Sequence, residues 1–405
     1  KKMKISIIGA GFVGLVTAVY FSDAGHDVEL IESDIHKKNQ IMSGIAPFHE
    51  NGLNPLLKKY IGKNLQVVSD IGNGIKNSDA VFVCVGTPLS DDGEIDLSHI
   101  ELVSKELGKN LKDLQKDVLV VVKSTVVPGT TEEICKKSIQ AWLTKQDYAR
   151  VFFGMNPEFL REGTAVYDTF NPDRIILGAD SEKAVNMFNE IYAFVPEDVP
   201  KFNTTIKTAE LSKYASNAFF ATLISFSNEI AELCDLDAEI DVNIVFKSLY
   251  ADRRFRVPDY TKQRSSLVSY LWPGIGYGGS CFPKDVLSII DFAKTKNVTL
   301  PVLQGVARTN ASQAKQIFNK FYDPTKHQAV GILGLSFKPD TDDIRSSKSL
   351  ELIEEALLVG LRVYCYDPLV KCLTGQIYND VRIQPTIESL LIWVDIIFLA
   401  TPRRE

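Results

Sequence analysis

The chain has 405 residues, of which 45% are hydrophobic and 24% are charged, and its formal net charge at pH 7 is -6. These values predict two or three ordinary globular domains with sizeable cores. Lysine and arginine are scattered along the chain and no apolar run reaches membrane-spanning length. The composition therefore argues against a nucleic-acid partner and against a membrane protein.

The six cysteines and five histidines predict neither a disulfide framework nor a metal site. The cysteines include no C-x-x-C pair, and the histidines lack the spacing of metal ligands. We expect no metal, a reducing cytoplasmic location, and histidines on the surface or in loops. The short polar start runs directly into a strand-like segment, which does not resemble a signal peptide.

The N-terminal segment has the pattern of a dinucleotide-binding unit. A strand at residues 5–8 is followed by G-x-G-x-x-G at residues 9–14, a helix at 15–24, and a strand at 28–31 that ends in Glu32. The glycines permit a tight turn and leave room for a pyrophosphate at the helix N-terminus, and the acid can bind the ribose hydroxyls. An acid also repels the 2′-phosphate of NADP, so the pattern predicts NAD. The nearby Lys37 weakens that preference, and a glycine turn without a nucleotide is the weaker alternative.

Polar residues follow the next strands of the same sheet. Strands at residues 80–85 and 118–122 are broken by segments that contain Thr87 and Thr125, and a strand at 151–154 leads to Glu158 and Glu162. Doubly wound folds bind ligands at the carboxyl ends of their strands. The two threonines are therefore candidate ligand contacts, with turn chemistry an equal alternative, and the two carboxylates belong to the same sheet edge. A further strand is expected at residues 175–178.

Residues 204–234 contain neither glycine nor proline and predict one helix of about 45 Å. A helix of that length often joins domains or builds a dimer interface. Lys213 and Asn217 are four residues apart, so they share a face. Their apolar and aromatic neighbours indicate partial burial.

The glycine-rich stretch at residues 274–285 is the strongest candidate for chemistry. Gly276, Gly278 and Gly279 allow unusual backbone angles and a close approach to a ligand, and they precede Cys281. Pro283 favours a helix start directly after the cysteine. A helix N-terminus and the nearby lysine both stabilise a thiolate. A buried cysteine on a tight turn is the alternative.

The C-terminal part repeats the strand–loop–helix–strand order of the start. A strand at residues 330–333 leads to a polar loop, a helix at 350–359, and a strand at 360–366 that ends at Asp367. Because this unit lacks G-x-G-x-x-G, it need not bind a dinucleotide. Lys338 and Arg345 in its opening loop can bind phosphate or be simply solvated.

Together these motifs resemble the nucleotide-sugar 6-dehydrogenases, the UDP-glucose and GDP-mannose dehydrogenase family. The resemblance extends from residue 5 to about residue 402, with seven motifs in the order of the family. The matching stretches are residues 9–14, 85–88, 123–125, 156–163, 210–217, 276–285 and 334–345.

The resemblance implies an α/β fold with two Rossmann-like doubly wound domains joined by a long central helix. The implied domains are an NAD-binding domain at residues 1–203, a helical dimerisation region at 204–310, and a nucleotide-sugar domain at 311–405. It implies a homodimer or higher homo-oligomer. Members usually continue with another helix and strand, so we expect residue 405 to mark a shortened C-terminus.

The resemblance also implies roles for individual residues. The implied catalytic residues are Cys281 as nucleophile, Glu158 as general base, Lys213, Asn217 and Asp285 around the oxidised C6, and Thr125. The implied NAD contacts are Gly9, Gly11, Phe12, Val13, Gly14, Glu32, Lys37, Thr87, Thr125, Glu162, Lys284 and Arg345. The implied nucleotide-sugar contacts are Glu158, Phe159, Leu160, Arg161, Lys213, Asn217, Arg254, Tyr270, Leu271, Trp272, Pro273, Gly274, Gly278 and Lys338. Arg254, or its neighbour Arg253, matches an arginine that reaches into the partner subunit's site, and Glu32 replaces the usual Asp.

The implied reaction is a four-electron oxidation of the UDP-glucose C6 alcohol to UDP-glucuronate, through a thiohemiacetal and a thioester on Cys281. GDP-mannose or a UDP-N-acetylhexosamine is the alternative substrate. Two rivals are a two-electron 3-hydroxyacid dehydrogenase and a non-catalytic sugar-nucleotide sensor. The yield of NADH per sugar separates the three: two, one and none.

Overall fold

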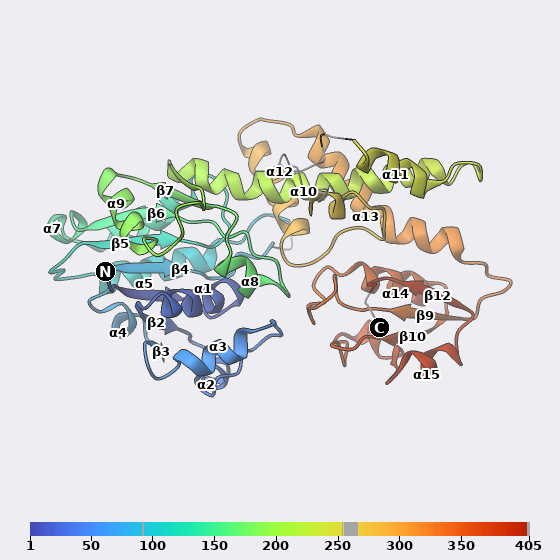
Figure 1. The fold of residues 1–405 in the computed structure, drawn as a ribbon, viewed down its shortest axis with the longest axis horizontal. Helices are drawn as coiled ribbons and strands as arrows, with labels where there is room; N and C mark the ends of the chain where they lie inside the picture. Colours follow the sequence, from blue (N-terminus) through green and yellow to red (C-terminus); the bar gives the residue numbers. More distant parts are fainter. Residues whose placement is uncertain (91–92, 253, 255–265, 403–405) are drawn as a thin grey trace. The chain divides into compact units, whose positions relative to one another are not determined.

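The computed structural model describes residues 1–90, 93–252, 254 and 266–402. The chain forms two compact units, Lys1–Ala215 and Ser216–Glu405. Figure 1 shows the ribbon with its helices and strands labelled. Within the described residues, no helix combines the length and apolar character needed to cross a membrane.

The first unit is built on one large sheet. Its strands are β1 (Lys4–Ile8), β2 (Asp27–Ile31), β3 (Leu65–Val68), β4 (Ala80–Val83), β5 (Val118–Val122), β6 (Val151–Met155), β7 (Ile175–Ala179) and β8 (Lys201–Thr204). The strand order is β3-β2-β1-β4-β5-β6-β7-β8. All neighbours are parallel except β6 and β7, which are antiparallel. The order reverses between β1 and β4, and in this fold ligands bind where the order reverses.

Helices cover both faces of this sheet. They are α1 (Phe12–Asp23), α2 (Ile35–Met42), α3 (Leu53–Tyr60), α4 (Ile71–Ile75), α5 (Ser98–Asn110), the π-helix η1 (Thr131–Lys136), α6 (Lys137–Gln140), α7 (Lys145–Tyr148), α8 (Ala165–Phe170) and α9 (Glu182–Ile191). Strand β4 is apolar throughout because its side chains alternate between two cores. Phe82 packs with Leu15 of α1, whereas Val81 and Val83 pack with Leu107 of α5.

The long helix predicted at residues 204–234 is present as α10 (Ile206–Cys234). It begins two residues later than expected because Lys201–Thr204 pairs with β7 as the edge strand β8. Among the histidines, His26 lies in a loop as expected but is buried rather than exposed, where its ring accepts a hydrogen bond from the Met3 N–H. This burial lowers the pKa of His26.

The second unit holds a smaller doubly wound sheet. Its elements after α10 are α11 (Val242–Tyr250), the 3-10 helix η3 (Ser266–Tyr270), α12 (Phe282–Thr295), α13 (Pro301–Phe321), β9 (Ala329–Leu333), α14 (Lys348–Leu358), β10 (Arg362–Tyr366), η4 (Gln376–Tyr378), β11 (Arg382–Ile383), α15 (Ile387–Leu391) and β12 (Ile396–Leu399). The four strands are parallel in the order β11-β10-β9-β12. One face packs on α13 and α14 through Val330 and Val363, and the other packs on Leu390 of α15.

Candidate active site

The glycine motif forms the turn between β1 and α1 that the sequence predicts. Gly9 has φ of +99°, and a Cβ there would lie 2.8 Å from the Cys84 carbonyl oxygen. A Cβ at Gly14 would lie 1.9 Å from the Gly9 oxygen, whereas a Cβ at Gly11 would have no atom within 4 Å. Gly9 and Gly14 are therefore needed for packing. Gly11, the N-cap of α1, is exposed beside the turn.

The Glu32 carboxylate lies next to this turn. Its oxygens accept the Ala10 N–H at 3.2 Å and the Asp34 N–H at 2.8 Å. Phe12 and Val13 form the partly buried first turn of α1, and Lys37 is exposed in the first turn of α2. An exposed helix N-terminus with an acid at the end of the second strand fits the pyrophosphate and ribose of NAD.

Thr87 and Thr125, which follow β4 and β5, are joined directly. The Thr87 hydroxyl donates to the Thr125 carbonyl at 2.8 Å, and Thr87 is buried. The two loops therefore form one surface at the carboxyl edge of the sheet. Glu162 is partly exposed in the loop after β6.

Glu158 and Lys213 form a buried ion pair. Lys213 Nζ lies 2.9 Å from Glu158 Oε1, and the side chains are 3% and 7% exposed. The Leu160 N–H donates to the other carboxylate oxygen at 2.5 Å. Burial by itself raises the pKa of the Glu158 carboxyl, but Lys213 and the Leu160 N–H outweigh it and hold this pKa below its ordinary value. Glu158 is therefore ionised at neutral pH.

A second buried lysine lies in the same unit at the end of β5. Lys123 Nζ donates to Asn156 Oδ1 at 2.7 Å, and the Tyr192 hydroxyl donates to the same oxygen at 2.5 Å. Burial lowers the pKa of Lys123 to about 8, partly offset by the charge of Glu158. The sequence indicated no role for Lys123, although a lysine directly after five apolar strand residues is a signal for one.

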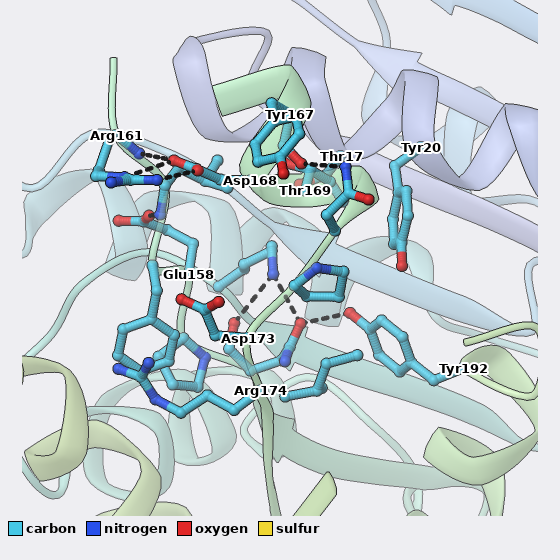
Figure 2. Close-up of a pocket in the computed structure, with 18 residues that line it drawn as sticks. Thr17, Tyr20, Glu158, Arg161, Tyr167, Asp168, Thr169, Asp173, Arg174 and Tyr192 are labelled. Carbon is cyan, nitrogen blue, oxygen red and sulfur yellow. Dashed lines mark hydrogen bonds and ion pairs between the residues drawn. The ribbon is translucent and has the colours of Figure 1, made fainter. Parts of the chain in front are cut away.

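Glu158 and Lys123 line a cavity of about 320 Å³. Figure 2 shows the Glu158 carboxylate directed into it, with Arg161 paired to Asp168 beside it. That pair has an N–O distance of 2.6 Å. The guanidinium of Arg174 stacks on the Phe159 ring at 3.9 Å. Residues 158–161, the segment predicted to contact the nucleotide sugar, therefore all line this cavity. Leu160 within this segment is partly buried.

In the second unit, Cys281 is the N-cap of α12, as predicted. It is partly buried, and its Sγ lies 3.6 Å from the Ser280 hydroxyl. One turn into the helix, the buried Asp285 accepts a hydrogen bond from Asn217 Nδ2 at 2.6 Å and pairs with Lys284 Nζ at 2.5 Å. The N-terminus of α12 therefore carries the thiol and a carboxylate whose two oxygens are held.

The loop predicted to contact the sugar nucleotide packs on aromatic residues of its own unit. The Tyr270 ring lies 4.4 Å from that of Phe220, and the buried Leu271 accepts a hydrogen bond from Tyr250 through its carbonyl. Trp272 is 48% exposed, and Pro273 and Gly274 follow it. Arg254 is exposed and pairs with Asp252, whereas the alternative Arg253 lies outside the described residues.

The loop after β9 differs from the glycine turn of the first unit. At the end of β10, the buried Asp367 accepts the N–H groups of Leu335 and Val370 at 2.8 and 3.1 Å. Its carboxylate faces backbone donors, consistent with the absence of G-x-G-x-x-G there. Lys338 Nζ lies 5.7 Å from the Phe337 ring centroid, and the Arg345 guanidinium pairs with Asp343 at 2.6 Å.

Glu210 is a further buried polar residue whose importance the sequence did not indicate. Its carboxylate accepts the N–H groups of Gly129 and Thr131 at 2.5 and 2.9 Å, and it is 0% exposed. Burial raises the pKa of Glu210. It fastens the loop that follows Thr125 to α10. Among the described side chains, no group of three His, Cys, Asp or Glu is arranged to hold a metal ion.

Three family models match the chain in succession. Residues 3–195 match the NAD binding domain of the UDP-glucose/GDP-mannose dehydrogenase family, residues 207–312 its central domain, and residues 331–405 its UDP binding domain. The glycine turn, together with the match to an NAD binding domain, identifies an NAD-dependent oxidoreductase. The chain belongs to the UDP-glucose/GDP-mannose dehydrogenase family, which confirms the resemblance found in the sequence.

Individual relatives agree over nearly the whole chain. UDP-glucose 6-dehydrogenases of Bacillus subtilis and Haloferax volcanii are 35% and 36% identical to it, over 98% of this chain and 87% and 91% of those proteins. The solved structure of a UDP-glucose dehydrogenase from the archaeon Pyrobaculum islandicum is 32% identical, with a TM-score of 0.89 over 99% of this chain and 90% of that one. This similarity confirms the predicted fold class.

Proposed function

We propose that the protein oxidises the C6 alcohol of UDP-glucose to the carboxylate of UDP-glucuronate, using NAD. The observation that carries this proposal is Cys281 at the N-cap of α12, with Asp285 one turn on, in a chain of this family. The names of its relatives support UDP-glucose over GDP-mannose or a UDP-N-acetylhexosamine.

Bound NAD accepts a hydride in each of the two oxidation steps. In the first step Glu158, ionised beside Lys213, takes the alcohol proton directly or through a water molecule as C6 becomes an aldehyde. The Cys281 thiolate then adds to C6, and the aldehyde oxygen takes back the proton held by Glu158 and becomes the hydroxyl of a thiohemiacetal. Loss of the C6 hydrogen as hydride and of the hydroxyl proton leaves a thioester.

Water hydrolyses this thioester. Asp285, held by Asn217 and Lys284, directs the water to C6, the C–S bond breaks, and the thiolate leaves as the carboxylate forms. Lys213 and Asn217 stabilise the negative oxygen of the tetrahedral species, where one preorganised donor contributes on the order of 3 kcal/mol. The covalent bond to Cys281 lets one site perform both oxidations without releasing the aldehyde.

We propose the same domain bounds as those expected from the sequence. The NAD-binding domain is residues 1–203, the dimerisation region 204–310 and the nucleotide-sugar domain 311–405. The dimer forms along α10, and Arg254 reaches the partner's site. A cytoplasmic location is proposed because the chemistry needs a reduced thiol, and all six cysteines, each among the described residues, are outside disulfides.

Product stoichiometry tests the proposal. The wild type is expected to form two NADH per UDP-glucose and to release an acid, whereas Cys281→Ser forms at most one NADH and no acid. Peptide mass spectrometry during turnover is expected to find a sugar adduct on Cys281. One NADH from the wild type indicates a two-electron dehydrogenase, none indicates a sensor, and full acid production by the Ser variant rules out the covalent route.

A further inference from the structure

The segment before Cys281 is held in place by side-chain amides from two helices. The Gly274 N–H donates to Asn228 Oδ1 at 2.8 Å, and the Gly274 carbonyl accepts from Gln313 Nε2 at 2.8 Å. The Tyr277 N–H donates to Asn310 Oδ1 at 2.8 Å, and the Tyr277 carbonyl accepts from Asn310 Nδ2 at 3.0 Å. Both backbone groups of two residues are thus held from outside the segment.

The Asn310 side chain pairs with the Tyr277 backbone in the way that a neighbouring β-strand would. Its amide presents one acceptor and one donor in a plane, and it pairs with both backbone groups of a single residue as another backbone would. The pairing also limits what can stand nearby: a Cβ at Gly276, where φ is +107°, would lie 2.6 Å from Asn310 Oδ1. The glycine is required because the asparagine lies against it.

Asn310 is itself fixed by a buried charge. Lys348 Nζ donates to the Asn310 carbonyl at 2.7 Å and pairs with Glu351 at 2.6 Å. Lys348 is 5% exposed, and Asn310 is 7% exposed. A lysine from the first turn of α14 therefore fixes the turn of α13 that carries the amide.

The other side of the segment packs on the loop after β9. The Gly279 N–H donates to the Arg345 carbonyl at 3.0 Å. A Cβ at Gly278 would lie 2.3 Å from the Ser346 carbonyl oxygen, and one at Gly279 would lie 2.7 Å from the Phe337 ring. The sequence led us to expect that these two glycines allow the backbone to approach a ligand. In the structure they instead allow it to approach the loop after β9.

We propose that Asn310 is a positioning residue that sets the place of the Cys281 thiol at the N-terminus of α12. Cys281 follows the held segment directly, and its carbonyl accepts the Asp285 N–H at 2.8 Å as the first bond of that helix. If Tyr277 loses its partner, both of its backbone groups are left unpaired, and the segment must shift to satisfy them even though the Tyr277 ring stays packed against Phe282. The thiol then leaves the helix terminus that stabilises its reactive form. This inference rests on the proposed role of Cys281 as the nucleophile.

The test measures the alkylation of individual cysteines by iodoacetamide, followed by peptide mass spectrometry, together with kcat and KM. Cys372 is exposed and serves as the reference for reagent strength, and the buried Cys365 reports unfolding. Asn310→Ala is expected to slow Cys281 alkylation and to lower kcat by roughly tenfold or more, with a smaller change in KM. Gln316→Ala, an exposed amide on the same helix, is the matched control.

Asn310→Asp separates positioning from general stability. A protonated carboxylic acid offers the same acceptor and donor as the amide, whereas the ionised form repels the Tyr277 carbonyl. The charged neighbours in contact with this turn include Lys348 with its partner Glu351, and Glu229 of α10, which accepts a hydrogen bond from the Thr309 hydroxyl at 2.7 Å. The rate of Cys281 alkylation relative to wild type is therefore expected to rise as pH falls, within one folded protein.

The outcomes distinguish the two proposals. Unchanged Cys281 alkylation and kcat in Asn310→Ala, or a flat ratio for Asn310→Asp across pH, overturns the positioning role. Equal slowing at Cys372, or reaction at Cys365, also overturns it, because the effect is then not local. A wild type that stays active after Cys281 is fully alkylated overturns the proposed nucleophile instead, whatever Asn310 does.

Discussion

The Glu158–Lys213 pair illustrates how a buried charge is compensated by a buried partner. Each side chain is nearly inaccessible, so each depends on the other for compensation. Because the pKa of Glu158 lies below its ordinary value, the pair contributes stability above the normal carboxyl range. That contribution is lost as pH falls through the lowered pKa.

Removing one partner is therefore expected to be worse for stability than removing both. Lys213→Met leaves a buried carboxylate and should lower the unfolding free energy by about 3 kcal/mol, with kcat down by about two orders of magnitude. The double variant with Glu158→Gln should recover most of the stability but none of the activity. Thermal unfolding and steady-state kinetics of Lys213→Met, Glu158→Gln and the double variant check this, and additive losses would contradict it.

Lys123 should give stability a dependence on pH of the same sign as Glu158, but in the alkaline range. Its pKa in the folded chain is about 8, below the value of 10.5 for an exposed lysine. Between these values the unfolded chain binds more protons, so stability rises with pH. From neutral pH to about pH 9.5, wild type should gain about 2 kcal/mol relative to Lys123→Met. Melting temperatures at fixed protein concentration test this, with the exposed Lys112→Met as control, and parallel curves would refute it.

Glu32 is expected to set the preference for NAD. Its carboxylate lies against the glycine turn, where we expect it to bind the ribose hydroxyls and to repel a 2′-phosphate. Glu32→Ser should lower kcat/KM for NAD and raise the ratio of NADP to NAD efficiency by roughly tenfold or more. Initial rates with both cofactors measure the ratio, and equal efficiency of the wild type with both would make the prediction wrong.

At the scale of elements, the sequence was informative where a segment is apolar on both faces. Residues 118–122 are valine and leucine only, and they form β5 at the predicted bounds. The edge strand β8, Lys-Phe-Asn-Thr, has no such pattern and pairs on one side, with two of its residues exposed. Residues 201–204 form a strand because they pair with β7. The local sequence also gave no sign that β7 runs antiparallel to β6.

Helix α10 leaves a row of large apolar side chains exposed. Leu211, Phe219, Phe226 and Leu233 are 47%, 51%, 45% and 57% exposed and are spaced seven or eight residues apart, so they share one face. Leu223 of the same helix instead packs partly against Phe246 and Tyr250 of α11. A second copy of the same helix is the proposed occupant of this face.

Phe226→Asp should therefore shift the protein from dimer to monomer. The specific activity of this variant should then fall as the protein is diluted. Light scattering at micromolar concentration gives the mass. Leu102→Asp, which changes an exposed leucine on α5, is the control that should stay dimeric. A wild-type monomer, or a Phe226→Asp dimer as tight as wild type, would contradict the role of α10.

At the scale of the whole molecule, the sequence predicted the positions of important residues better than the hydrogen bonds between residues distant in the chain. Cys281 before a helix and the glycine turn at residues 9–14 were readable, because each depends on neighbours within a few residues. Asn310 and Glu210 were not, because their partners are backbone groups 33 and 79 to 81 residues away. A buried amide that pairs with a distant loop leaves no local pattern.

The substrate preference is a prediction about the whole chain, since the match to a UDP binding domain at residues 331–405 is separate in sequence from the proposed nucleophile Cys281. A pocket that hydrogen-bonds one base leaves polar groups unpaired when another base is bound, which can cost several orders of magnitude in efficiency. Residues 331–405 match a UDP binding domain, so UDP sugars should exceed GDP-mannose in kcat/KM by at least about a hundredfold. Among UDP sugars, UDP-glucose is expected to exceed UDP-N-acetylglucosamine and UDP-N-acetylmannosamine, because an acetamido group at C2 needs volume that a hydroxyl does not. Following NADH by absorbance with each sugar separately gives the ranking. Turnover with GDP-mannose or an N-acetylated sugar alone would refute the choice of UDP-glucose, while the family and the role of Cys281 would stand.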